Sequence, residues 1–144
     1  MKRFLDKPVD YPNLKYVCIN VGVNDTDENS GVSVFNSLKE TIENVRARFN
    51  AKVIVSEITP RKRNRKSEVS SCNRLLNEYV KEKDYLFIAR HENLQELLYD
   101  EKHVKETCIA RYAANIKNAL RKAYNRPFNT RSTVSKNGML RNQR

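Results

Sequence analysis

The chain alternates short apolar runs with longer stretches in which apolar residues recur every three or four positions. The apolar runs predict buried β-strands at residues 16–21, 52–58 and 85–89. The amphipathic stretches predict helices at about residues 33–49, 67–82 and 105–124. Strands separated by helices require crossover connections. We therefore expect an α/β fold, with a short parallel sheet of about three strands between two helical layers.

The last predicted helix carries its apolar residues on one face, and the chain changes character after it. That face consists of Ile109, Tyr112, Ile116, Leu120 and Ala123. Ile116 and Leu120 are expected to be buried against the sheet. Arg126-Pro127 ends the helix, and the residues beyond it are too polar to pack. The chain is therefore divided into an N-terminal segment (1–14), a globular domain (15–124) and a basic tail that is predicted to be disordered (125–144).

Two short polar motifs lie where an α/β sheet positions functional groups. Gly22-Val23-Asn24-Asp25 directly follows the first predicted strand, so it delivers an asparagine to the carboxyl edge of the sheet. Asp100-Glu101-Lys102-His103 places a carboxylate three residues before a histidine, a spacing at which the carboxylate can hold the imidazole in one tautomer. Each motif also has a purely structural explanation. The first is typical of a tight turn with a helix cap, and the second of a solvated turn.

Together these motifs resemble those of the SGNH/GDSL hydrolase family. Gly22 and Asn24 are similar to its G-x-N-D block, and Asp100 and His103 to its D-x-x-H block. The intervening Ile58-Thr59-Pro60-Arg61 is similar to the corresponding turn of invertebrate and retroelement-associated members. The resemblance implies a flavodoxin-like fold and hydrolysis of a small ester by a serine nucleophile, without a metal or other cofactor.

The same resemblance assigns a role to each residue of the two motifs. Asn24 is expected to donate to the oxyanion, His103 to act as the base and Asp100 to orient the His103 ring. Gly22 and Asp25 are expected to shape the site. A serine hydroxyl needs such a base, because it is a poor nucleophile at neutral pH.

The resemblance covers only the second half of such a domain, over residues 15–124. The family's Gly-Asp-Ser block holds the nucleophile, and a second block supplies a glycine of the oxyanion hole; neither is found in the residues before Tyr16. Ser30 and Ser33 are weak substitutes, because nothing places them on a nucleophile turn. We therefore expect a truncated SGNH-type domain with little or no esterase activity of its own.

The strand order of the family, 2-1-3-4-5, has a consequence for the first predicted strand. Residues 16–21 correspond to a strand that normally pairs with the absent first strand, so they would form an apolar sheet edge. Three alternatives follow and stay open. The N-terminal residues cover the edge, the chain forms a homo-oligomer through it, or the domain is only marginally stable.

The net charge of +11 is concentrated in two segments. One is a loop that contains Arg61, Lys62, Arg63, Arg65 and Lys66. The other is the tail, which has no acidic residue and contains Arg126, Arg131, Lys136, Arg141 and Arg144. Such segments are most often solvated surface, but they also attract phosphates in a salt-sensitive way. The alternative function is therefore a non-enzymatic module that binds an anionic ligand or nucleic acid, although neither segment has the interleaved aromatic residues of a base-stacking surface.

Composition sets the remaining expectations. A chain of 144 residues with 39% apolar residues suits one small domain. No apolar run reaches membrane-spanning length and the N-terminus lacks the apolar core of a signal peptide, which predicts an intracellular, cytoplasmic protein without a membrane partner. Cys18, Cys72 and Cys108 lack metal-ligand spacing and are interpreted as structural thiols. His91 is interpreted as a surface residue.

Overall fold

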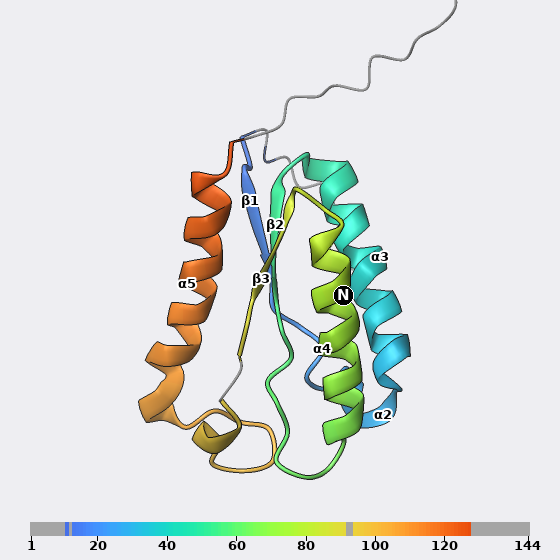
Figure 1. Ribbon diagram of the computed structural model, residues 1–144, viewed down its shortest axis with the longest axis vertical. Helices are drawn as coiled ribbons and strands as arrows, with labels where there is room; N and C mark the ends of the chain where they lie inside the picture. Colours follow the sequence, from blue (N-terminus) through green and yellow to red (C-terminus); the bar gives the residue numbers. More distant parts are fainter. Residues whose placement is uncertain (1–10, 12, 92–93, 128–144) are drawn as a thin grey trace, which may run out of the picture.

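The computed structural model describes residues 11, 13–91 and 94–127. Within them, three parallel strands form one sheet in the order β1 (Tyr16–Ile19), β2 (Lys52–Ser56) and β3 (Leu86–Ala89). One face of the sheet is covered by α3 (Gly31–Phe49) and α4 (Lys66–Lys81), and the other by α5 (Ile109–Asn125) (Figure 1). The predicted three-layer α/β architecture is confirmed. The expectations for residues 1–10 and for the tail from 128 to 144 lie outside the described residues.

The centre of the core is β2, which is buried along its whole length. On the side of α3 and α4, the largest cluster includes Ile42, Val53, Val55 and Leu76. On the side of α5, a smaller cluster contains Ile54, Phe87, Ala89, Ala119 and Ala123. A strand that is covered on both faces has apolar residues at consecutive positions, which explains why the apolar run revealed it.

The connections at the carboxyl ends of the strands are short and irregular. After β1 comes the single helical turn α2 (Asp25–Glu28), and after β3 come two 3₁₀ turns, Gln95–Leu97 and Glu106–Cys108. The second strand was predicted to reach residue 58 but ends at Ser56. Beyond it, the Asn73 side chain accepts from the Ile58 N–H at 2.9 Å and donates to the Ile58 carbonyl at 2.7 Å, so it takes the place of a neighbouring strand.

The buried face of α5 differs from the predicted one. Ile109 and Leu120 are 53% and 41% exposed, so the expectation that Leu120 is buried is wrong. The helix instead packs on the sheet through Ala119 and Ala123, with Ile116 partly buried beside them. Two stripes on this helix satisfy the helical period, and the small alanines allow the helix to approach the sheet closely. The predicted stripe is therefore correct at Ile116 and Ala123 and wrong at Ile109 and Leu120.

As the family resemblance implied, β1 is an outer strand of the described sheet. A groove of about 520 Å³ follows it, lined by residues of β1 and by Leu14, Val45 and Phe49 among others. The Cys18 side chain is exposed on this strand. Self-association through β1 stays a prediction.

A tight contact between the start of α3 and the first turns of α4 depends on a glycine. A Cβ atom on Gly31 would lie 2.2 Å from the backbone oxygen of Glu68. The Gly31 N–H also donates to the Glu68 carboxylate at 2.6 Å, which fixes the start of α3 on α4. The two helices therefore approach each other at a point where no other residue fits.

Gly31→Ala is expected to lower the free energy of unfolding by roughly 1–3 kcal/mol, because the added methyl group forces the two helices apart. In an open helical position the same change is stabilising by up to about 1 kcal/mol. Urea unfolding followed by circular dichroism measures the difference. Ser37→Ala, at an exposed position of the same helix, serves as the control and should change stability by less than about 0.5 kcal/mol. A Gly31→Ala protein as stable as the parent would contradict the close packing.

Candidate active site

An aspartate and a histidine form a preassembled pair in the loop before α5. The Asp100 Oδ2 atom lies 2.7 Å from Nδ1 of His103. The other carboxylate oxygen of Asp100 accepts the backbone N–H groups of His103 at 2.7 Å and of Lys102 at 2.8 Å. The backbone N–H of His103, that of Lys102 and then the His103 ring hold the pKa of the Asp100 carboxyl well below its usual range. An ionised Asp100 keeps the proton of His103 on Nδ1, which leaves Nε2 able to accept one.

The loop that carries this pair is closed by its own backbone. Leu98 and Val104 form an antiparallel bridge, and the N–H of Tyr99 donates to the carbonyl of His103 at 3.0 Å. The Tyr99 ring stacks on the His103 ring, with centroids 5.6 Å apart and planes at 16°. The side chain of His103 is still 53% exposed, so it is accessible from solvent.

The predicted oxyanion donor lies at the same end of the sheet. Asn24 follows β1, and its loop and the loop of His103 both lie at the carboxyl ends of the strands (Figure 1). The two loops are in contact through Lys102, whose ammonium lies 3.3 Å from the carboxamide oxygen of Asn24. With its oxygen facing Lys102, the Asn24 side chain has its amide nitrogen as the donor for another group. Asn24 precedes α2 but makes no capping bond to it.

Gly22 and Asp25 shape the turn that presents Asn24. The φ angle of Gly22 is +103°, which residues with a Cβ rarely adopt, and a Cβ there would lie 3.0 Å from the side chain of Ile58. The carbonyl of Gly22 accepts the N–H of Thr26 at 3.1 Å, and the carbonyl of Asp25 accepts that of Asn29 at 3.0 Å. Both residues therefore act on the turn through the backbone.

Asp27 joins the three segments of the site, although it belongs to neither of the two sequence motifs. Its carboxylate accepts from Lys102 at 2.8 Å and from Arg61 at 2.7 Å. The Lys102 hydrogen bond is the largest cause of a lowered Asp27 pKa, and the charge of Arg61 adds to it. The turn after β1, the Thr-Pro-Arg segment after β2 and the loop of His103 are thus held together by one carboxylate.

Two cations of the basic loop face the protein interior. Arg61 is only 3% exposed and donates to the Val23 carbonyl at 2.7 Å as well as to Asp27. Arg65 donates from Nε to the Thr26 carbonyl at 2.7 Å. Arg61 is therefore already paired with Asp27, and its part in binding an anion stays a prediction.

The other cations of this loop are more accessible. Arg63 and Lys66 are exposed, and Lys62 is partly exposed. The basic tail beyond residue 127 lies outside the described residues. A role of these cations in binding an anion or nucleic acid stays a prediction, with fewer groups available than the sequence indicated.

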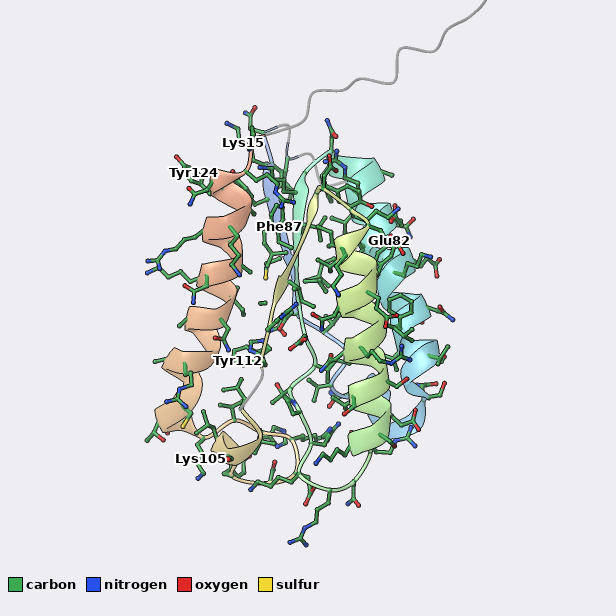
Figure 2. The ribbon with its side chains drawn as sticks, in the orientation of Figure 1. Lys15, Glu82, Phe87, Lys105, Tyr112 and Tyr124 are labelled. Carbon is green, nitrogen blue, oxygen red and sulfur yellow. The ribbon has the colours of Figure 1, made fainter. Side chains whose placement is uncertain are left out.

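The second histidine of the chain is buried rather than exposed, contrary to its interpretation as a surface residue. His91 is 0% exposed, and its Nε2 atom lies 2.8 Å from the hydroxyl of Ser56. The Asn115 amide lies 3.1 Å from Nδ1 of His91, and the Tyr112 ring stacks on the imidazole at 4.1 Å between centroids. Figure 2 shows Tyr112 between α5 and the sheet. Burial lowers the pKa of His91 to about 4, so the ring is neutral near pH 7.

The contacts of the buried pair of Ser56 and His91 indicate a structural role. The Asn115 amide donates to Nδ1, so the ring proton is on Nε2 and is donated to Ser56. The Ser56 hydroxyl in turn donates to the Glu57 carbonyl at 3.1 Å. A general base requires the opposite arrangement, in which the imidazole accepts the proton of the serine. This pair therefore satisfies buried polar groups and does not activate Ser56.

Comparisons with known proteins agree with this geometry at the level of the fold. No protein-family model matches the chain, and a search of curated proteins finds no significant relative. A carbohydrate esterase family 3 structure from Talaromyces cellulolyticus superposes with a TM-score of 0.65 at 21% identity, over 75% of this chain and 57% of that chain. A lipolytic G-D-S-L family protein from Veillonella parvula gives the same TM-score of 0.65 at 16% identity, over 88% of this chain and 71% of that chain.

The chain has an SGNH/GDSL-type hydrolase fold. It spans little more than half the length of the esterase, since 57% of that chain is matched. Among the described residues, no group of three or more histidine, cysteine, aspartate or glutamate side chains is placed to hold a metal ion. In the same part of the chain, every helix is too short or too polar to cross a membrane.

Proposed function

We propose that this chain supplies the base, the orienting acid and one oxyanion donor of an SGNH-type ester hydrolase site, and that the nucleophile comes from residues outside it. The observation that carries the proposal is the Asp100–His103 pair at 2.7 Å, tied to Asn24 through Lys102. A solvated turn has no need of contacts to the turn of Asn24. Here Lys102 contacts Asn24 and Asp27, and Asp27 also pairs with Arg61, so three segments far apart in the sequence meet at this site.

In this proposal each group has a separate chemical task. Nε2 of His103 accepts the proton of an attacking serine hydroxyl and later donates it to the leaving alcohol. Asp100 keeps the His103 ring oriented and stabilises the imidazolium that forms. The Asn24 amide donates a hydrogen bond to the oxyanion of the tetrahedral intermediate.

The structural neighbours support an ester as the substrate. Both are described as acting on esters or lipids, one as a carbohydrate esterase and the other as a lipolytic protein.

Neither Ser30 nor Ser56 is a ready nucleophile. Ser30 accepts the N–H of Ser33 at 3.2 Å as the cap of α3, and Ser56 is only 1% exposed. The chain alone is therefore proposed to be nearly inactive.

The test is to fuse an N-terminal half of an SGNH hydrolase, with its Gly-Asp-Ser block, to the start of the chain. Hydrolysis of a short-chain nitrophenyl ester should appear in the fusion and fall by at least about a thousandfold in its His103→Ala variant. Lys117→Ala, at an exposed position of α5, is the matched control and should retain the rate. A folded fusion without turnover, or turnover that survives His103→Ala, would contradict the proposal.

A further inference from the structure

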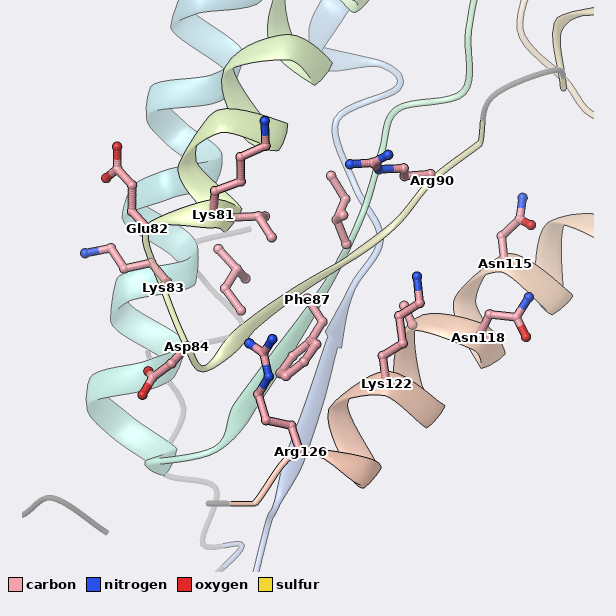
Figure 3. Close-up of a pocket in the computed structure, with 14 residues that line it drawn as sticks. Lys81, Glu82, Lys83, Asp84, Phe87, Arg90, Asn115, Asn118, Lys122 and Arg126 are labelled. Atoms are coloured by element: carbon pink, nitrogen blue, oxygen red, sulfur yellow. The ribbon is translucent and has the colours of Figure 1, made fainter. Parts of the chain in front are cut away.

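A second surface feature lies along the outer edge of β3, on the side away from β2. It is a cleft of about 780 Å³ between the end of α4 and the helix α5, and its floor consists of Leu86, Phe87 and Ile88 (Figure 3). None of the candidate active-site residues lines it. The cleft is therefore independent of the proposed hydrolase site.

The backbone of β3 presents hydrogen-bonding groups to this cleft. The carbonyl of Tyr85 accepts the N–H of Val53 in β2 at 2.8 Å, and that of Ala89 accepts the N–H of Glu57, the residue after β2, at 3.0 Å. In a parallel pair, alternate residues direct both of their backbone groups to the same neighbour. The N–H and C=O groups of Leu86 and Ile88 consequently point away from β2. Such a row is the template that an extended peptide can complete.

The walls of the cleft are mostly cationic. Two carboxylates line it, those of Glu82 and Asp84. Five basic side chains line it as well, namely Lys81, Lys83, Arg90, Lys122 and Arg126. In Figure 3 the cationic ends of Lys81, Arg90 and Lys122 surround the mouth of the cleft, whereas Glu82 and Asp84 project from its outer side. Asn115 and Asn118 add amide groups on the wall that α5 forms. The charge of this surface matches an acidic partner.

We propose that the edge of β3 binds an acidic peptide segment in an extended conformation, as a fourth strand of the sheet. The backbone of the peptide pairs with Leu86 and Ile88, and its carboxylates face Lys81, Lys122 and Arg126. The tail of this chain is not the occupant, because it contains four basic and no acidic residues beyond residue 127. The first ten residues are also more basic than acidic.

A nucleic acid fits this cleft less well than a peptide. Among the described residues that line it, Phe87 is the one with an aromatic ring; it is 8% exposed, and the guanidinium of Arg126 lies over it at 5.4 Å. No aromatic face is thus presented on which a base could stack. Phosphates would meet the cations but would not use the backbone groups of β3.

The experiment measures the binding of a fluorescent peptide of alternating glutamate and valine by anisotropy, with an alternating lysine and valine peptide as the control ligand. Only the acidic peptide should bind, and more weakly as NaCl rises from about 0.05 M to about 0.3 M. Lys122→Glu should weaken binding roughly tenfold, because it puts a carboxylate against the peptide. Lys117→Glu makes the same charge change outside the cleft and should alter binding less than about twofold.

Hydrogen exchange of the unmodified protein tests the added strand without a variant. The amides of Leu86 and Ile88 should exchange at least about tenfold more slowly with the acidic peptide bound. Equal effects of Lys122→Glu and Lys117→Glu, or binding without this protection, would overturn the proposal. So would a single-stranded oligonucleotide that binds more tightly and displaces the peptide. Protection of both amides without peptide, together with dimers in sedimentation, would assign the edge to a second copy of the chain instead.

Discussion

The purified chain is expected to give no covalent label with a serine-directed fluorophosphonate and no burst with a nitrophenyl ester. Such reagents trap a serine only where a base removes its proton and an oxyanion hole stabilises the adduct. Removal of the nucleophile of a serine triad lowers turnover on the order of a millionfold. The deficit of this chain should therefore be about as large.

The reason for this deficit is chemical rather than conformational. The Asp100–His103 pair is already at hydrogen-bonding distance, and Lys102 and Asp27 hold its loop to the turn of Asn24. Intact-mass spectrometry after incubation with the reagent measures the label, and a known serine esterase serves as the positive control. Stoichiometric labelling of the unmodified chain would contradict the prediction. Ser33 would then be the first serine to substitute, because Ser30 is engaged as a helix cap.

The elements of the fold could be predicted from the sequence because each gives a local signal. The central strand β2 has three consecutive apolar residues, and α3 repeats its apolar residues with the helical period. The orientation of α5 could not be predicted in the same way. Ala119 is buried although it lies outside the predicted stripe, whereas Leu120 within that stripe is 41% exposed.

The candidate site was only partly accessible from the sequence, for a similar reason. Asn24, Asp100 and His103 belong to short motifs, in which the spacing itself carries the signal. Asp27 and Arg61 are separated by 34 positions, and only the fold brings them into an ion pair. A loop rich in cations therefore resembled a solvated surface, although its buried Arg61 pairs with the carboxylate of Asp27.

The burial of His91 could not be predicted either, because its partners are distant in the sequence. Its sequence neighbours Arg90 and Glu92 are charged, which is typical of a surface segment. The partners that allow its burial come from β2 and α5, where Ser56, Asn115 and Tyr112 contact both ring nitrogens and the ring face. Burial without these partners would be unfavourable. The protonation of this ring should consequently control stability in acid.

The protein is expected to lose roughly 3 kcal/mol of stability as the pH falls from about 6.5 to about 4, through His91 alone. Burial lowers the pKa of His91 in the folded state from its ordinary value of 6.5 to about 4. The unfolded chain therefore takes up a proton over this range before the folded protein does. The contribution is fully present above pH 6.5 and is lost as the pH falls towards the folded pKa.

Urea unfolding at several pH values measures this loss, and His91→Gln should remove it because the amide does not titrate. His103→Gln is the matched control, since it keeps the buried imidazole and should keep the loss. The chain has two histidines, so the imidazole signal that disappears from the NMR spectrum of His91→Gln identifies His91. That signal should titrate near pH 4 in the folded protein. A midpoint near 6.5, or an acid loss that persists in His91→Gln, would show that His91 is not the buried neutral histidine described above.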